Sequence, residues 1–381
     1  MSAQGQSSGV SAVVLAAGMS RRMGTPKQLL RMDGKTILER TLENVRKSAV
    51  DEIILVLGFA ADTVEKEISA GGMSTQGIKV VRNDAYQQGM GTSLRTGLGA
   101  LDAKTSAALI VLADQPFVRA ATLDNLIECH QQSKPQIVIP MYKGFRGNPV
   151  LLDRSVLPEL KDLNGDVGCR AIFGDHTENI RKLPVDDAGI LLDIDSHEDF
   201  QKLCNASAEN NSVKNEPSAI LESKNDVPAG RPELVLVGRD EVVRALAKIG
   251  WVLNFTVTVV DPFLPHSELP EADRVLHELD FSLLPVANER YAVVASRGQF
   301  DEEAVAQALH ANISYIALLA NKKRAQELSA SLRVQSIAPE KLAAIRAPAG
   351  LEIGAESPDE IALSIMAEIV AVRRHREKNK P

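Results

Sequence analysis

The chain has few cysteines, and their positions suit neither a disulfide framework nor a metal site. Cys129, Cys169 and Cys204 are therefore expected to be free thiols in a reducing, cytoplasmic setting. Long apolar runs are also missing. No stretch of about 18 apolar residues occurs, so no membrane-spanning helix is expected. The first nine residues are small and polar, which is unlike a signal peptide.

Basic residues are outnumbered by acidic ones, 43 Lys and Arg against 50 Asp and Glu. The net charge is −7, and no face rich in Lys and Arg stands out that would neutralise nucleic-acid phosphates. This argues against a nucleic-acid partner. The rest of the composition, 44% hydrophobic and 24% charged residues, is ordinary for a globular protein, and 381 residues predict two or three domains.

Strand-like and helix-like stretches alternate along most of the chain, which predicts α/β domains. The composition of residues 205–231 shifts to Asn, Ser, Glu, Lys and Pro, which bury too little apolar surface to fold. We predict a Rossmann-like three-layer domain followed by a second Rossmann-like α/β domain. The expected parts are a disordered lead at 1–9, a first domain at 10–204, a flexible linker at 205–231, a second domain at 232–374 and a tail at 375–381.

Apolar runs and amphipathic stretches predict the elements of the first domain. A helix is also expected to begin near His197. The predicted strands cover residues 13–15, 53–57, 78–81, 109–112 and 137–139, and the predicted helices cover 37–47, 61–69, 93–101 and 121–131.

The stretch from Val10 to Lys27, VSAVVLAAGMSRRMGTPK, carries the clearest functional signal. A buried strand leads into small residues, which leave backbone amides open to an anion. Arg22 and Lys27 add positive charge. A plain strand-to-helix turn is the alternative, but the full spacing LAAG-x-S-x-R-M-G-x-x-K favours triphosphate binding. The nucleotide candidates here are Leu15, Ala16, Ala17, Gly18 and Gly24.

Two aspartates are candidates for a metal site. Asp114 follows the run ALIVLA, so it lies at the carboxyl end of a predicted strand, where open α/β sheets bind ligands. Asp195, in LLDIDSHEDF, comes from much later in the chain. Carboxylates at this edge suit Mg²⁺ held against substrate phosphates. Each also has a structural alternative as a turn or helix cap.

Three further loops offer candidates for substrate binding. The string NDAYQQGMGTS precedes a predicted helix, YKGFRGNPV lies between strands, and GDVGCR opens another predicted helix. Their alternative is an ordinary loop or cap, and Cys169 is expected to be buried packing because no nearby histidine would activate it. The candidates are Asn83, Gly89 and Ser93 for the nucleotide and Asn148, Asp166 and Arg170 for the second substrate.

Together these strings resemble the MocA-like family of molybdenum cofactor cytidylyltransferases across residues 10–203. The matching strings are LAAGMSRRMGTPKQLL, VLGFAAD, GMGTSLRTGL, VLADQP, YKGFRGNPVLL, GDVGCR and DIDSHEDF. The resemblance implies transfer of CMP from CTP to the phosphate of molybdopterin, with or without molybdenum. It assigns the triphosphate to Gly18, Arg22 and Lys27 and Mg²⁺ to the two aspartates. Ala17 replaces a glycine typical of guanosine-using relatives, which favours CTP over GTP.

The implied reaction places few demands on acid–base chemistry. The attacking phosphate is already ionised at neutral pH, so no general base or nucleophilic side chain is needed. Alignment and charge neutralisation are the catalytic tasks. Arg22, Lys27 and Asp114 are therefore the predicted catalytic residues.

The second domain opens with RPELVLVGRDEVVRALAKIGWVLNFTVTVVDP, the outline of a dinucleotide-type βαβ unit. Gly238 and Asp261 are candidates for a bound cofactor, because their separation (261 − 238 = 23) is near that expected for an acid reaching a ribose hydroxyl. However, Arg239, Asp240 and Glu241 stand where a phosphate turn needs small residues. A purely structural βαβ unit is therefore an equal alternative to an NAD site.

Later strings resemble the carboxyl-terminal Rossmann-like domain of the XdhC/CoxI family over about 233–374. They are YAVVASRGQFDEEAVAQAL, YIALLANKKRA and APAGLEIGAESPDEIALSIMAEIVAVRR. The resemblance implies binding of molybdenum cofactor and its delivery to a hydroxylase of the xanthine dehydrogenase type. It adds Ser296, Arg297, Gly354 and Glu356 as candidates near the ligand. The basic stretch 322–324 is interpreted as a solvated face, with phosphate binding as the alternative.

The sequence thus predicts a cytidylyltransferase fused to a cofactor-binding or delivery domain, with Mg²⁺, CTP and molybdopterin as small-molecule partners. Two alternatives remain for the reaction: cytidylyl transfer to another phosphorylated alcohol or sugar, and a GTP-using guanylyltransferase. The second domain has its own alternative, a scaffold or docking module.

Overall fold

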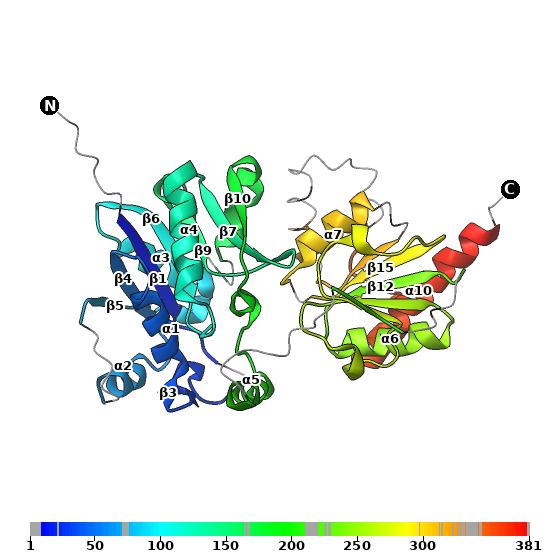
Figure 1. Ribbon diagram of the computed structural model, residues 1–381, viewed down its shortest axis with the longest axis horizontal. Helices are drawn as coiled ribbons and strands as arrows, with labels where there is room; N and C mark the ends of the chain where they lie inside the picture. The colour runs from blue at the N-terminus through cyan, green and yellow to red at the C-terminus, as the bar shows by residue number, and fades with distance from the viewer. Residues whose placement is uncertain are drawn as a thin grey trace. The chain divides into compact units, whose positions relative to one another are not determined.

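The computed structural model in Figure 1 describes two α/β units. One unit comprises residues up to 142 and from 146 to 214, and the other comprises 143–145 and the residues from 215 onward. Each unit has its own main sheet. The described residues are 9–20, 23–70, 76–163, 165, 168–209, 220–224, 227, 230–296, 298–311, 313, 315–321, 324–326, 328, 332, 342 and 345–378.

The sheet of the first unit has eight strands in the order β10-β7-β9-β6-β1-β4-β5, with β8 beside β7. β1 is central and runs parallel to β4 and β6, whereas β9 runs antiparallel to β6 and β7. The strands are β1 (Gly9–Ala16), β4 (Glu52–Leu57), β5 (Ile78–Arg82), β6 (Thr105–Leu112), β7 (Ile137–Tyr142), β8 (Phe145–Arg146), β9 (Val150–Asp153) and β10 (Ile180–Pro184).

Helices cover both faces of this sheet because alternate residues of β1 point to opposite sides. Val14 packs with residues of α1, α2 and α4, whereas Val13 packs with residues of α3 and the 3₁₀ helix η3. The helices are η1 (Lys27–Leu29), α1 (Ile37–Arg46), α2 (Ala61–Ala70), η2 (Tyr86–Gln88), α3 (Met90–Gly99), α4 (Ala120–Ser133), η3 (Arg154–Asp162), η4 (Cys169–Ile172), η5 (Gly174–Asn179), η6 (Ala188–Leu191) and α5 (His197–Glu209).

The second unit has a seven-stranded sheet in the order β11-β14-β13-β12-β15-β16-β17. All neighbouring pairs are parallel except β11 with β14. The order reverses between β12 and β15, the point where such sheets bind ligands. Its elements are β11 (Leu221–Ser223), β12 (Glu233–Val237), α6 (Glu241–Val252), β13 (Thr256–Val260), η7 (His266–Glu268), β14 (Arg274–Leu276), η8 (Phe281–Leu283), β15 (Arg290–Val294), α7 (Asp301–His310), β16 (Ile316–Leu318), β17 (Ile345–Arg346) and α10 (Pro358–Lys378).

The predicted fold class, two successive Rossmann-like α/β domains, is confirmed, but several boundaries differ. α3 begins at Met90, so Ser93 lies one turn inside the helix instead of at its start. The predicted linker is shorter than 205–231, because α5 runs to Glu209 and residues 221–223 form β11. α10 continues to Lys378, past the predicted domain end. Within the described residues, no helix has the length and apolar run needed to cross a membrane.

Candidate functional site

The turn after β1 lies between the ends of two neighbouring strands. The carbonyl of Leu15 accepts a hydrogen bond from the Ala113 amide at 3.1 Å, and that of Ala17 accepts one from the Phe59 amide at 3.3 Å. A side chain on Gly18 would meet no atom within 4 Å, so the fold leaves open space there. The small residues therefore lie at the carboxyl edge of the sheet with room beside the backbone. Arg22 lies outside the described residues.

Lys27 is the positive group that the structure brings to this edge. Its backbone amide donates to Ser20 Oγ at 3.0 Å. Its ammonium lies 2.5 Å from Asp114 Oδ2 and 2.9 Å from Asp195 Oδ1. Burial lowers the pKa of Lys27, but the two carboxylates outweigh burial and raise it above its usual range. The Lys27 ammonium therefore stays charged at any pH at which the protein would work.

Hydrogen bonds hold the late segment that carries Asp195 against the strand end that carries Asp114. The Ile194 amide donates to the carbonyl of Asp114 at 3.1 Å. Gln115 Nε2 donates to the Ile190 carbonyl at 3.3 Å and also to Asp193. Two aspartates separated by 81 positions (195 − 114 = 81) thereby meet at one ammonium.

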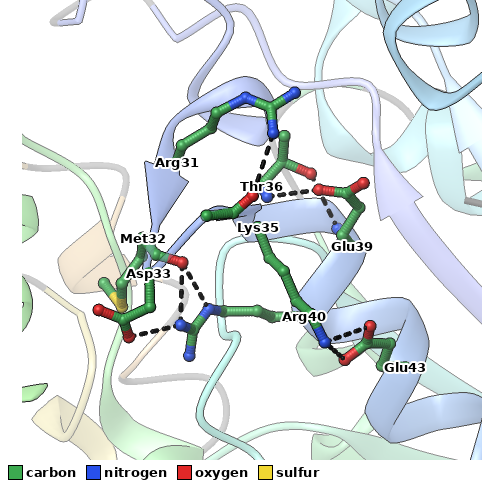
Figure 2. Close-up of polar contacts among 9 residues, drawn as sticks. Arg31, Met32, Asp33, Lys35, Thr36, Glu39, Arg40 and Glu43 are labelled. Atoms are coloured by element: carbon green, nitrogen blue, oxygen red, sulfur yellow. Dashed lines mark hydrogen bonds and ion pairs between the residues drawn. The ribbon is translucent and has the colours of Figure 1, made fainter. Parts of the chain in front are cut away.

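A small hairpin connects the segment that carries Lys27 with the segment that carries Asp195. β2 (Arg31–Met32) and β3 (Lys35–Thr36) pair just after η1 and lead directly into α1. Figure 2 shows Arg40 bonded to the Met32 carbonyl and to Asp33, and Thr36 bonded to Glu39. The Met32 side chain is buried with Ile194, the residue before Asp195. The hairpin thus ties the Lys27 segment to the Asp195 segment.

The sequence left two roles open for Asp195, metal ligand and helix cap, and the structure shows that other residues form the cap of α5. Helix α5 is capped by Ser196, whose Oγ accepts from the Asp199 amide at 3.1 Å, while Asp199 accepts from the Ser196 amide at 2.9 Å. This reciprocal pair satisfies the helix start without Asp195. The Asp195 carboxylate is consequently directed to Lys27.

Asp193 is a further carboxylate beside Asp114, two positions before Asp195. Burial and the neighbouring Asp114 raise the pKa of Asp193 to about 7. Gln115, from the LADQP string, donates a hydrogen bond to it. The spacing D-x-D in LLDIDSH was the available signal, but the contact with Gln115 depends on the tertiary fold.

The donor set fits a hard divalent cation such as Mg²⁺. One oxygen of Asp114 and one oxygen of Asp195 both contact the Lys27 ammonium, so the two carboxylates lie close enough to share one cation. In the described part of the chain, no group of three or more His, Cys, Asp or Glu is placed to hold a metal. Two carboxylates are nevertheless typical of Mg²⁺, which takes its other ligands from water and substrate phosphates. Asp114 and Asp195 are thus the residues that would hold it.

The predicted nucleotide residues after β5 form a closely bonded loop. The side-chain amide of Asn83 donates to Thr92 Oγ1 and Ser93 Oγ, both at 2.9 Å, and its oxygen accepts from the Ala85 amide. Gly89 has a φ of 107° at the N-cap of α3, a conformation that favours glycine. Asn83 and Ser93 thus shape this loop, and contact of either with a nucleotide stays a prediction.

A cavity of about 310 Å³ opens beside this loop. It lies at the carboxyl ends of β4 and β5, and a side chain on Gly58 would lie 2.8 Å from the Ala17 Cβ. The cavity and the small-residue turn are therefore neighbours. The lining includes Gly58, Ala60, Asp62, Arg82, Asn83 and Tyr86.

The candidates for the second substrate have different surroundings. The backbone amide of Asn148 donates to the Ile190 carbonyl at 3.1 Å, which places Asn148 beside the segment leading to Asp195. Arg170 is exposed in η4, and Asp166 lies outside the described residues. Cys169 is buried, and burial raises the pKa of its thiol to about 12, so it stays a packing residue as expected.

In the second unit, Gly238 and Asp261 have structural roles in their turns. Gly238 has a φ of 119°, and a side chain there would lie 2.6 Å from the Ala295 carbonyl oxygen. Asp261 is buried, and its Oδ1 accepts from the amides of Phe263 and Leu264 at 2.9 Å each. Asp240 caps α6 by accepting from the Val243 amide at 3.0 Å. Cofactor contact by Gly238 or Asp261 stays a prediction.

The remaining candidates of this unit are placed at helix starts. Ser296 donates to Asp301 at 2.6 Å at the beginning of α7. The amides of Glu356 and Ser357 both donate to Glu360 at 2.9 Å, which caps α10. Gly354 has a φ of 72° in the loop before this cap. Arg297 and residues 322–323 lie outside the described residues.

Comparison with known proteins agrees with this two-part layout. Residues 12–180 match the MobA-like NTP transferase domain, and residues 234–369 match the XdhC Rossmann domain. Molybdenum cofactor cytidylyltransferase of Escherichia coli K12 is 26% identical over 195 residues, which are 51% of this chain and 94% of that protein. Nicotine blue oxidoreductase of Paenarthrobacter nicotinovorans is 27% identical over 203 residues, 51% of this chain and 96% of that protein.

A further relative matches less of its own length. Protein YqeB of Escherichia coli K12 is 34% identical over 152 residues, which are 38% of this chain and 28% of that protein. The relatives matched over nearly their whole length thus carry the names of a nucleotidyltransferase and an oxidoreductase. On the two family matches, this chain joins a MobA-like NTP transferase domain to an XdhC Rossmann domain.

Proposed function

We propose that the first unit transfers CMP from CTP to the phosphate of molybdopterin and releases pyrophosphate. The observation that carries this proposal is the convergence of Lys27, Asp114 and Asp195 beside an open, small-residue turn. A triphosphate needs positive charge and free amides, and carboxylates such as these would hold the divalent cation that accompanies it. The similarity to the Escherichia coli cytidylyltransferase over 94% of its length supports this choice of substrates.

The residues act by charge and position. Asp114 and Asp195 would hold Mg²⁺, which would supply positive charge to neutralise the phosphates. Lys27, together with Arg22, binds the leaving pyrophosphate, and the turn amides align the α-phosphate. No side chain has to remove a proton, because the attacking phosphate is already ionised.

Ala17 supports CTP over GTP in this proposal. It is buried, and it packs so closely on the loop after β4 that Gly58 has no room for a side chain. The methyl group of Ala17 therefore lies beside Gly58, a residue that lines the neighbouring cavity. In this proposal the methyl group favours the smaller base, cytosine.

The second unit is proposed to bind the cytidylated cofactor or to pass it to a molybdenum hydroxylase. The match to the XdhC Rossmann domain supports this role. A shared chain keeps product at high effective concentration near the second site. The three cysteines are free thiols, which fits a cytoplasmic location.

Pyrophosphate release by the full chain tests the proposal. With Mg²⁺ and molybdopterin, we expect release with CTP and much less with GTP. Asp114→Asn should lower the rate at least about 100-fold, because a group that neutralises charge during transfer is lost. Asp359→Asn, at an exposed aspartate of α10 in the second unit, is the matched control and should keep the wild-type rate.

Each other result has a distinct meaning. Release with GTP alone would contradict the role given to Ala17 and support a guanylyltransferase. Release with a sugar or polyol phosphate but not with molybdopterin would support the alternative acceptors. A wild-type rate for Asp114→Asn would overturn the assignment of the metal ligand.

A further inference from the structure

Lys27 occupies the position that a divalent cation would take. Its ammonium contacts one oxygen of Asp114 and one of Asp195, the same two carboxylates that suit Mg²⁺. Metal–oxygen distances of about 2.0–2.1 Å would leave no room for an ammonium between the same oxygens. Two positive ions at one position also repel each other. The ammonium and the metal therefore exclude each other there.

The Lys27 side chain can leave while its backbone stays in place. The backbone amide is fixed by Ser20, and the next residue, Gln28, donates to the Ala16 carbonyl at 2.8 Å. The ammonium is carried on a flexible four-carbon stem. Because Gln28 ties this segment to the small-residue turn, the displaced ammonium remains next to the open space beside Gly18.

We propose that Lys27 is a resident cation that metal must displace, and that the displaced ammonium then binds the triphosphate. Lys27 therefore weakens metal binding until a nucleotide offers the ammonium other oxygens. By linkage, metal and nucleotide each strengthen the binding of the other. This exchange rests on the metal and triphosphate roles proposed above. It adds the order of events: the metal displaces the ammonium, and the ammonium then binds the triphosphate.

Mn²⁺ titration of the full chain without nucleotide tests the exchange. The electron paramagnetic resonance signal of free Mn²⁺ reports the bound fraction, so no turnover is needed. Lys27→Met removes the competing charge and should tighten Mn²⁺ binding about tenfold, within the usual range of coupling between sites. Lys27→Arg keeps the charge and should bind Mn²⁺ as weakly as wild type.

Two further variants locate the effect. Lys35→Met removes an equal charge from the hairpin, where Lys35 pairs with Glu43, and should leave Mn²⁺ affinity unchanged. Adding Asp195→Asn to Lys27→Met should abolish the gain, because one of the two carboxylates is lost. Circular dichroism checks that each variant is folded, and Lys27→Gln replaces Lys27→Met if that variant is unfolded.

Equal or weaker Mn²⁺ binding by Lys27→Met would overturn the proposal, and so would an equal gain in Lys27→Arg. A gain that survives Asp195→Asn would place the metal elsewhere and also contradict it. The titration contains neither CTP nor molybdopterin, so its outcome does not depend on the assigned substrates. Failure of pyrophosphate release would conversely leave the titration interpretable.

Discussion

His277 is enclosed in the second unit, where it has no exposed surface. Its Nδ1 lies 3.1 Å from the Asp261 carbonyl, and Glu222 lies 3.5 Å from its Nε2. Burial lowers the pKa of His277, and Lys143 adds to this, while Asp261 and Glu222 oppose it. The folded unit therefore keeps His277 neutral at a pH where the unfolded chain protonates it.

This difference predicts how stability depends on pH. Below about pH 6.5, the pKa of His277 in the unfolded chain, the unfolded state binds a proton that the folded state does not bind. Stability is therefore lost as pH falls. Between pH 7.5 and 5.5, His277→Gln should therefore lose less unfolding free energy than wild type. Urea unfolding followed by the single tryptophan, Trp251, reports on this unit.

His310→Gln, which removes an exposed histidine of α7, is the control and should retain the wild-type loss. An unchanged pH dependence in His277→Gln would contradict the neutral, buried state of His277.

At the scale of residues, the sequence singled out candidates most clearly where a motif carries its own chemistry. Lys27 and Asp114 belong to such motifs, and the structure brings them together. The role of Asp195 depended on which residue caps α5, and only the Ser196–Asp199 pair shows that. The side chain of Asn83 is bonded within its own loop through contacts that no local pattern reveals.

Helix α3 packs on the central strands through Gly97, where helix propensity and packing oppose each other. Alanine in place of a helical glycine gains up to about 1 kcal/mol. However, a Cβ on Gly97 would lie 2.3 Å from Val13 Cγ1 and 2.9 Å from Val56 Cγ2. Overpacking of this kind costs about 1–3 kcal/mol, so Gly97→Ala should destabilise the first unit by about 1 kcal/mol.

Gly99→Ala is a matched control in the same helix, because a Cβ there would meet no atom within 4 Å. It should be neutral or slightly stabilising. Thermal unfolding followed by circular dichroism compares the two, and a Gly97→Ala variant as stable as Gly99→Ala would contradict the close packing of α3.

At the scale of elements, long apolar strands and amphipathic helices were predictable from periodicity. Strands β4 and β5 lie within one residue of their predicted bounds. The hairpin of β2 and β3 was missed because each strand has only two residues, too few to show a period. No local pattern predicted β10 (IRKLP), whose position depends on its pairing with β7. Long-range pairing, invisible in local sequence, decides such short strands.

At the scale of the whole molecule, composition separated two domains but misjudged the segment between them. Residues 221–223 are polar enough to resemble a linker, yet they pair with β14 at residues 274–276. The pairing comes from backbone hydrogen bonds, which composition does not encode. The two family matches cover both units, so the chain unites a nucleotidyltransferase domain with an XdhC domain.

Transfer of label from CTP carrying ³²P in the α-phosphate to molybdopterin tests the central claim most directly. With Mg²⁺ and the full chain, we expect the label to appear in a pterin product and the released pyrophosphate to be unlabelled, because the bond between the α- and β-phosphates breaks. Label that remains in CTP, or that appears only in free CMP, would contradict nucleotidyl transfer to the pterin phosphate.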